Sequence, residues 1–439
     1  MDVKWRNLLS WLNDHGMDTS EHFLLVERRL TYPEHYGLYA KKALSLKTML
    51  FTIPRTALLN RKTLSSYYGI ATKSLSAMQM ISLHLLLHRP LSGRESLDPL
   101  FGPYISTLPQ NFDYHPLSWT IKRNIGPSLD ILPPDAFWAL QDLSSKFRND
   151  LAAVSSFILE ATSKAPSEFV EDNESLVHDY LWAWLNVNTR CVYYQIKNSP
   201  SDPDNITLCP ILDFANHSSH LPCMTPPSPG DGNLRSNLYR DFSLLSPSDS
   251  SVDADSELHL QYGAHCNRVL FIEYGFVLSL NSIPEDQRTL EVNVDDIVEA
   301  LVVEKGETGV WMKSVLILDN YWRDWTMHYA SGSAFPSYRL VIALRLISVF
   351  PSGPLPSSSE EMLRPWKNVV LGNCDKLSSN LENAWRNILR NVCITVIERA
   401  STALVTPEVK VHDCVVALWA EERFVAERIL DLIKNGEIF

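Results

Sequence analysis

The chain has 439 residues, with 39 Lys and Arg against 51 Asp and Glu, and so a formal net charge of −12 at pH 7. Its 45% hydrophobic and 10% aromatic residues are typical of a globular protein long enough for about two or three domains. The acidic balance argues against tight binding of nucleic acid, whose phosphates attract a basic surface. A net negative charge is better suited to a basic protein or peptide partner.

The elements expected in the first half alternate between helix and strand. Residues 4–15 carry apolar side chains at helical spacing and end before Gly16, which predicts a short amphipathic helix. Residues 22–59 contain short apolar runs separated by proline and glycine, which predicts short strands and turns. The helical period then returns from about 60 to 190, most clearly at 78–88, 134–162 and 175–190.

The second half begins with strands and ends with helices. Residues 191–280 predict short strands separated by loops rich in Pro, Ser and Asp. Beyond Pro284 the helical period dominates, with a Pro/Ser linker at 351–359. The clearest of these helices are expected at 294–303, 310–321, 337–349, 381–400 and 409–434.

This layout is that of an α+β protein in which a strand-rich module is divided by a helical insertion and followed by a helical domain. We expect an N-terminal helix and the first part of the module in 1–59, and the insertion in 60–174. The second part of the module is expected in 175–283, and the helical domain in 284–439.

Neither the cysteines nor the N-terminus suggests a secreted protein or one stabilised by a structural metal. The seven cysteines are scattered and form no Cys-x-x-Cys pair, so we expect neither a disulfide framework nor a bound metal. Residues 1–5 lack the features of a secretory signal, and no apolar run approaches the roughly 20 residues of a membrane span. We expect a monomeric intracellular protein, cytoplasmic or nuclear, with no membrane or nucleic-acid partner.

Three short segments carry residues that could bind a ligand, and each is ambiguous alone. The first is residues 33–40, in which Gly37 could let the backbone approach a ligand, although a lone glycine there is more often part of an ordinary β-turn. The second ends a helix at Arg190, which either complements the helix dipole or clamps a carboxylate with its guanidinium. Trp182 and Trp184 of the same helix fit the core better than a ligand cage.

The third segment runs from Pro210 to Ser218 and contains Asp213, Asn216 and His217. Taken alone, an Asn-His-Ser sequence is more often a polar turn than a site. Here it is followed, across an insertion, by the Tyr-Gly corners that begin at Tyr262 and Tyr274. The combination is more specific than any one of the three segments.

With these motifs in this order, the sequence resembles the SET-domain protein methyltransferases, specifically the class of the Rubisco large-subunit methyltransferase. The resemblance follows nearly the whole chain and is carried mainly by residues 175–280. It implies a SET fold of short strands with a pseudoknot, a helical insertion, and an all-α C-terminal domain that binds a protein substrate. It also implies S-adenosyl-L-methionine as cofactor and methyl transfer to a lysine ε-amine of that protein.

The same resemblance assigns roles to residues of this chain. Tyr262 would be the catalytic tyrosine, Asp213 would lie near the incoming side chain, and Tyr262 and Tyr274 would line the substrate channel. His217 would contact adenine mainly through its backbone rather than act as a base. The full set expected to contact the cofactor is Glu34, His35, Tyr36, Arg190, Asn216, His217 and Tyr274.

One departure from the family leaves alternatives open. The family's cofactor turn commonly reads Gly-x-Gly, whereas His35-Tyr36-Gly37 keeps only the second glycine. A catalytically weak SET-fold protein that binds a partner is therefore the competing hypothesis, and a helical scaffold with a fortuitous motif is a third. Val192, which offers no polar partner to an imidazole, favours lysine over histidine as the acceptor.

Overall fold

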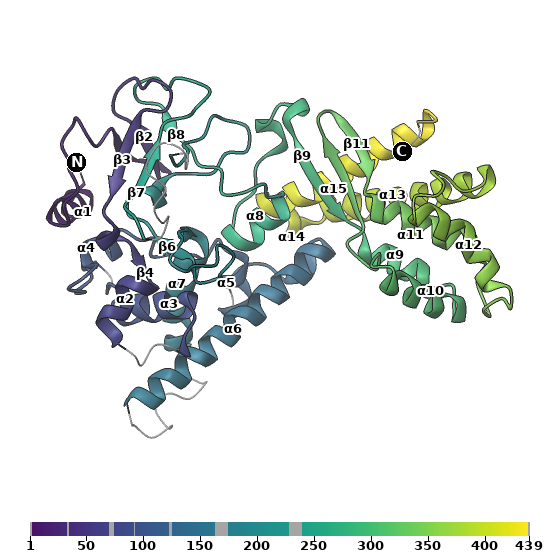
Figure 1. Ribbon diagram of the computed structural model, residues 1–439, viewed down its shortest axis with the longest axis horizontal. Coiled ribbons are helices and arrows are strands. Elements are labelled where there is room, and N and C mark those ends of the chain that lie inside the picture. The colour runs from purple at the N-terminus through teal and green to yellow at the C-terminus, as the bar shows by residue number, and fades with distance from the viewer. Residues whose placement is uncertain are drawn as a thin grey trace. The chain divides into compact units, whose positions relative to one another are not determined.

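The computed structural model, shown in Figure 1, describes residues 2–32, 35–69, 74–91, 93–122, 125–162, 174–227 and 239–437. The chain forms two compact units. The first consists of Met1–Gly126 and Gln141–His265, and the second of Pro127–Leu140 and Cys266–Phe439.

The first unit contains three small antiparallel sheets, and each joins strands from both sides of the helical insertion. Strands β1 and β2 pair with β8, β3 pairs with β7, and β4 pairs with β6, which also pairs with β5. The strands are β1 (Val26–Tyr32), β2 (His35–Ala40), β3 (Met49–Ile53), β4 (Leu59–Asn60), β5 (Val192–Tyr193), β6 (Ile206–Leu208), β7 (Phe242–Leu245) and β8 (Glu257–Leu258).

The helices of the first unit lie mostly between β4 and β5. They are α1 (Val3–Asp14), α2 (Arg61–Tyr68), α3 (Ala77–Leu87), α4 (Gly102–Ile105), α5 (Pro116–Ile121), α6 (Pro134–Thr162) and α7 (Glu174–Arg190). Helix α6 begins in the second unit and continues into the first. The four helices expected from hydrophobic periodicity, 4–15, 78–88, 134–162 and 175–190, are confirmed to within one residue at each end.

Helix α7 shows why its aromatic residues belong to the core. Trp184 is fully buried, and its indole N–H donates to Asp150 Oδ2 of α6 at 2.9 Å. Trp182 is 3% exposed, and its indole donates to the Pro109 carbonyl oxygen at 2.7 Å. Buried indoles with satisfied donors are structural, so the interpretation as core residues is confirmed. This packing holds α7 in place and thereby positions Arg190, its last residue.

The second unit is mainly helical. Its helices are α8 (Asn267–Tyr274), α9 (Asp295–Val303), α10 (Glu307–Leu318), α11 (Tyr338–Val349), α12 (Ser359–Val370), α13 (Ser379–Val405), α14 (Pro407–Lys410) and α15 (Asp413–Lys434). They surround a core that contains the fully buried indoles of Trp325, Trp366 and Trp385. Helices α9, α10, α11, α13 and α15 lie where the helical period beyond Pro284 predicted helices.

Two features of the second unit differ from the sequence-based expectation. A three-stranded antiparallel sheet accompanies the helices, formed by β9 (Thr289–Asn293), β10 (Thr326–Ala330) and β11 (Ser333–Pro336). The strand expected at the second Tyr-Gly corner is wrong, because residues 267–274 form helix α8, which ends at Gly275 in a left-handed conformation (φ 83°). A short run of aromatic and β-branched residues does not by itself distinguish a strand from a buried helix.

Short 3-10 turns complete the described structure: η1 (Arg55–Ala57), η3 (Leu129–Ile131), η5 (Leu212–Phe214), η6 (Leu280–Ser282) and η7 (Glu285–Gln287). Within the part of the chain that the structure describes, none of the helices combines the length and apolar character needed to cross a membrane.

Candidate active site

The Asn-His-Ser turn and the segment before Tyr262 lie side by side in the first unit. The Leu260 N–H donates to the Asn216 carbonyl oxygen at 2.9 Å, and the Ser218 N–H donates to the Leu260 carbonyl oxygen at 3.0 Å. His217 and Leu260 thereby form a parallel β-bridge. This pairing of two segments distant in the sequence is consistent with the pseudoknot that the resemblance implied.

Strand β2 joins the same assembly through β8. The Asn216 amide Nδ2 donates to Glu257 Oε1 of β8 at 2.7 Å and lies 3.5 Å from the Tyr36 carbonyl oxygen of β2. Because Asn216 is exposed while its Nδ2 is held by these contacts, its Oδ1 remains available to accept a hydrogen bond from a ligand.

Gly37 is required where β2 meets β8. A Cβ at this position would lie 2.5 Å from Glu257 Oε1 and 3.0 Å from Thr31 Cγ2. The glycine therefore admits the carboxylate that holds Asn216, in addition to any backbone approach to a ligand. Sequence reasoning noticed the glycine but missed Glu257, since a lone acidic residue in a short strand carries no signal of its own.

Tyr262 is half-buried and is held at three points. Its hydroxyl donates to the Ala215 carbonyl oxygen at 2.8 Å, and its backbone N–H donates to His217 Nδ1 at 3.2 Å. Its ring lies against the His217 ring, with centroids 5.1 Å apart. Burial lowers the pKa of His217, so its imidazole is neutral near pH 7. Since Nδ1 accepts the Tyr262 N–H, the contacts favour a positioning role for His217 over a general base.

The buried side chain of Asp213 lies beside the partly exposed side chain of Arg190. Arg190 Nη1 donates to the Asp213 carbonyl oxygen at 2.6 Å and lies 3.6 Å from Asp213 Oδ2. The Tyr104 hydroxyl of α4 donates to the same Oδ2 at 3.1 Å. Burial raises the pKa of Asp213 above its ordinary value, and Arg190 opposes that shift. With its side chain 2% exposed, Asp213 anchors Arg190, and its approach to a substrate stays a prediction.

The backbone before Asp213 is strained. Ile211 has φ 68° and ψ −52°, and the Leu212 N–H donates to the Pro210 carbonyl oxygen at 2.8 Å. This is the rarer form of γ-turn, which is costly for a β-branched residue. Such strain concentrates at functional sites, where the surrounding structure holds it in place.

The side chains of His35 and Tyr36 pack against neighbours that the sequence did not suggest. Arg28, whose side chain is 2% exposed, stacks its guanidinium over Tyr36 at 4.3 Å and over Phe214 at 5.0 Å. Arg28 also pairs with Asp2. The ring of His35 lies 5.7 Å from that of Tyr114. Arg28 went unnoticed because a charged residue in a strand normally indicates a solvent-facing position.

The roles assigned to Glu34 and Tyr274 rest on the resemblance alone. Glu34 lies outside the described residues. Tyr274 lies on α8 of the second unit, where its ring is 6.2 Å from that of Phe276 and burial raises its pKa. Their assigned roles stay predictions.

Comparisons with known proteins agree with the motifs. A ribosomal lysine N-methyltransferase of Schizosaccharomyces pombe is 26% identical over 336 residues, which cover 76% of this chain and 74% of that protein. SET domain-containing protein 4 of Mus musculus is 25% identical over 382 residues, covering 84% of this chain and 76% of that protein. No protein-family model matches the chain.

The fold agrees as well. The crystal structure of the SET domain of LSMT, bound to lysine and AdoHcy, aligns with a TM-score of 0.63 at 18% identity, over 99% of this chain and 91% of that one. The resemblance predicted from residues 175–280 is therefore confirmed in both homologues and fold. The chain is thus similar in sequence to a ribosomal lysine N-methyltransferase and to SET domain-containing protein 4, and similar in fold to the SET domain of LSMT.

Proposed function

We propose that the chain is an S-adenosyl-L-methionine-dependent protein-lysine N-methyltransferase, which transfers a methyl group to the ε-amine of a lysine in a protein substrate. The observation that carries the proposal is the position of Tyr262, whose hydroxyl is fixed on Ala215 beside the Asn-His-Ser turn. The names of the relatives, and the lysine and AdoHcy bound in the related SET domain, support it.

The residues present fit the cofactor. Arg190 Nε is buried and has no hydrogen-bond partner among the described residues, so it can donate to the carboxylate of the cofactor's methionine part. Asn216 Oδ1 can accept from its ammonium group, and the Glu257 carboxylate beside it favours that positive charge. The bound cofactor supplies an already activated methyl group on a sulfonium centre.

The chemical task left to the protein is to present a neutral amine in line with the sulfur–methyl bond and to exclude water. Lysine has a reference pKa near 10.4, so it must lose a proton before transfer, and desolvation beside aromatic side chains favours that loss. Because the Tyr262 hydroxyl gives its hydrogen to Ala215, its oxygen can accept an N–H of the amine and aim the lone pair at the methyl group. The cofactor, held by Arg190 and Asn216, would supply its methyl group to that nitrogen.

A second candidate, a catalytically weak SET-fold protein that holds a partner, is motivated by the altered cofactor turn at His35 and Tyr36. Both side chains have protein neighbours, since Tyr36 lies under Arg28 and His35 beside Tyr114. This packing supports the methyltransferase hypothesis, because side chains that pack against other protein residues need not occupy the adenosine pocket.

Calorimetric titration of the folded chain with S-adenosyl-L-methionine separates the two candidates. The enzyme requires saturable binding at one site per chain, and the absence of detectable binding would rule it out.

We also propose that the chain acts as an intracellular monomer, cytoplasmic or nuclear, on protein rather than on nucleic acid or membranes. The net charge of −12 supports a protein partner over nucleic acid, because an acidic protein repels phosphate backbones and attracts basic, lysine-bearing segments.

A further inference from the structure

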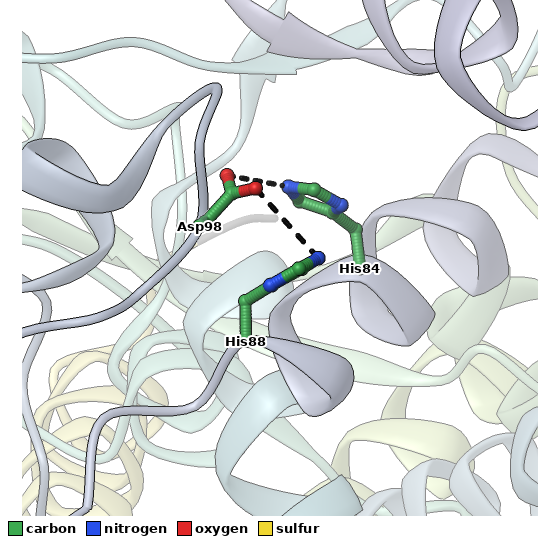
Figure 2. Close-up of side chains that lie close together, drawn as sticks. All are labelled: His84, His88 and Asp98. Carbon is green, nitrogen blue, oxygen red and sulfur yellow. Dashed lines mark hydrogen bonds and ion pairs between the residues drawn. The ribbon is translucent and has the colours of Figure 1, made fainter.

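A second polar cluster lies in the helical insertion and shares no residue with the site described above. Figure 2 shows His84 of α3 and His88, just past the end of α3, facing the carboxylate of Asp98. His84 Nε2 lies 3.0 Å from Asp98 Oδ2, and His88 Nε2 lies 3.6 Å from Oδ1. The side chains of His84 and Asp98 are fully buried, and that of His88 is 20% exposed.

The carboxylate of Asp98 is incompletely satisfied. Its Oδ2 accepts from the Phe101 N–H at 2.7 Å, but Oδ1 is buried and has no hydrogen-bond partner among the described residues. The 3.6 Å separation from His88 Nε2 is too long for a hydrogen bond. A buried carboxylate oxygen without a donor is costly, so Oδ1 points to a ligand between it and His88.

The cluster also has the outer contacts that hold metal ligands in place. The Tyr68 hydroxyl lies 2.8 Å from His84 Nδ1, the ring nitrogen on the far side from Asp98. In metal sites the distal ring nitrogen of a ligating histidine usually donates to such an oxygen, which fixes the tautomer and the ring orientation. The Phe101 N–H holds the carboxylate in the same way.

We propose that His84, His88 and Asp98 bind a divalent transition-metal ion, of which Zn²⁺ best suits two imidazoles and a carboxylate. The three ligand atoms lie within 4.8 Å of one another, whereas tetrahedral zinc spaces its ligands about 3.3 Å apart. Binding therefore draws in His88, the partly exposed member. The fourth position is left to water.

The metal would position part of the active site rather than act in catalysis. The Asp98 carbonyl oxygen accepts from Gly102, the first residue of α4, and the ring of His84 packs against Phe101 at 5.8 Å. Helix α4 carries Tyr104, which donates to Asp213 and so supports Arg190. An ion that joins α3 to the start of α4 stabilises this chain of contacts.

Metal titration of the full chain tests the proposal. After treatment with EDTA and dialysis, Zn²⁺ is added in a calorimeter, and Co²⁺ is added with its visible absorption recorded. We expect one equivalent of either ion to bind and to raise the melting temperature. His88→Ala should weaken binding at least about tenfold, since it removes a ligand but keeps the contact between His84 and Asp98.

His178→Ala is the matched control, because His178 is also a histidine near a carboxylate, 4.0 Å from Glu174 on the surface of α7. It should bind Zn²⁺ as the parent does. Tyr68→Phe should weaken binding about tenfold without abolishing it. A parent that binds no Zn²⁺, or that binds it equally well after His88→Ala, would show that the cluster is only a hydrogen-bonded link between Tyr68, His84 and Asp98.

Discussion

The hydroxyl of Tyr262 donates a 2.8 Å hydrogen bond to the carbonyl oxygen of Ala215, one residue before the Asn-His-Ser turn. This bond fixes the direction of the hydroxyl hydrogen, so that the oxygen would act toward an incoming amine as a hydrogen-bond acceptor. In the proposed function, Tyr262 orients the acceptor amine while other residues bind the cofactor. Turnover and cofactor binding should therefore be separable by mutation.

Tyr262→Phe removes the oxygen that orients the amine but keeps the ring that packs on His217. We expect turnover to fall by about 100-fold or more, with cofactor affinity within about twofold of the parent. Single-turnover rates and calorimetry measure the two effects. Tyr193→Phe, at a tyrosine 59% exposed on β5, is the control and should leave both unchanged. Near-normal turnover of Tyr262→Phe would remove Tyr262 from the catalytic role.

Asn216→Ala should act on the cofactor instead. It removes the proposed acceptor for the ammonium group and releases Glu257 from its 2.7 Å hydrogen bond. Hydrogen bonds to charged groups contribute roughly 1.5–3 kcal/mol, so the cofactor dissociation constant should rise about tenfold or more. Asn198→Ala, at an exposed loop position, serves as the control. A parent-like affinity in Asn216→Ala would mean that the turn does not bind the cofactor.

Gly37→Ala tests the close approach of β2 and β8. The added Cβ would meet Glu257 Oε1 at 2.5 Å, so the carboxylate must move away from Asn216. We expect a loss of about 1–3 kcal/mol in the free energy of unfolding, together with weaker cofactor binding. Adding Glu257→Ala relieves the clash, so the stability loss should be smaller than the sum of the two single variants. Strict additivity would contradict this account of Gly37.

The second unit should be sensitive to pH through Glu421. This residue is 3% exposed, accepts from Asn267 Nδ2 at 2.7 Å, and has its pKa raised by burial from 4.5 to about 8. The folded state therefore binds more protons than the unfolded state, so stability is lost as the pH rises from about 4.5 through about 8. The loss is at most about 1.4 kcal/mol per pH unit from this group.

Glu421→Gln keeps an acceptor for Asn267 and removes the titration. Denaturation near pH 5 and near pH 8 should show a smaller loss of stability in the variant than in the parent. An equal loss in both would show that Glu421 is ionised in the folded protein, or that it does not titrate in this range.

The sequence predicted the long elements well because their periodicity extends over several turns. Helix α6 begins at Pro134, as expected of proline in a first turn, and its full length was predicted. Strand β9 has only five residues, and its buried Leu290 and Val292 alternate too briefly to stand out among helices. Helix α8 was mistaken for a strand because its apolar run is equally short.

Within the candidate site, the resemblance predicted roles for Tyr262 and Asn216 but not the neighbouring residues that contact the site. Glu257, Tyr104 and Arg28 act through contacts between segments distant in the chain, and no local pattern marks them. The pair His84 and His88 was likewise hidden. Its four-residue spacing lies in an apolar helix, and its carboxylate partner comes ten or more residues later on a separate segment.

The most direct test of the proposed activity is mass spectrometry of a cell lysate incubated with the purified chain and S-adenosyl-L-methionine carrying an isotope-labelled methyl group. We predict labelled methyl groups on lysine side chains of one or a few proteins, absent when Tyr262→Phe replaces the parent. Labelled histidine in place of lysine would contradict the assigned acceptor. No labelled protein, from a folded chain that binds the cofactor, would contradict the methyltransferase itself.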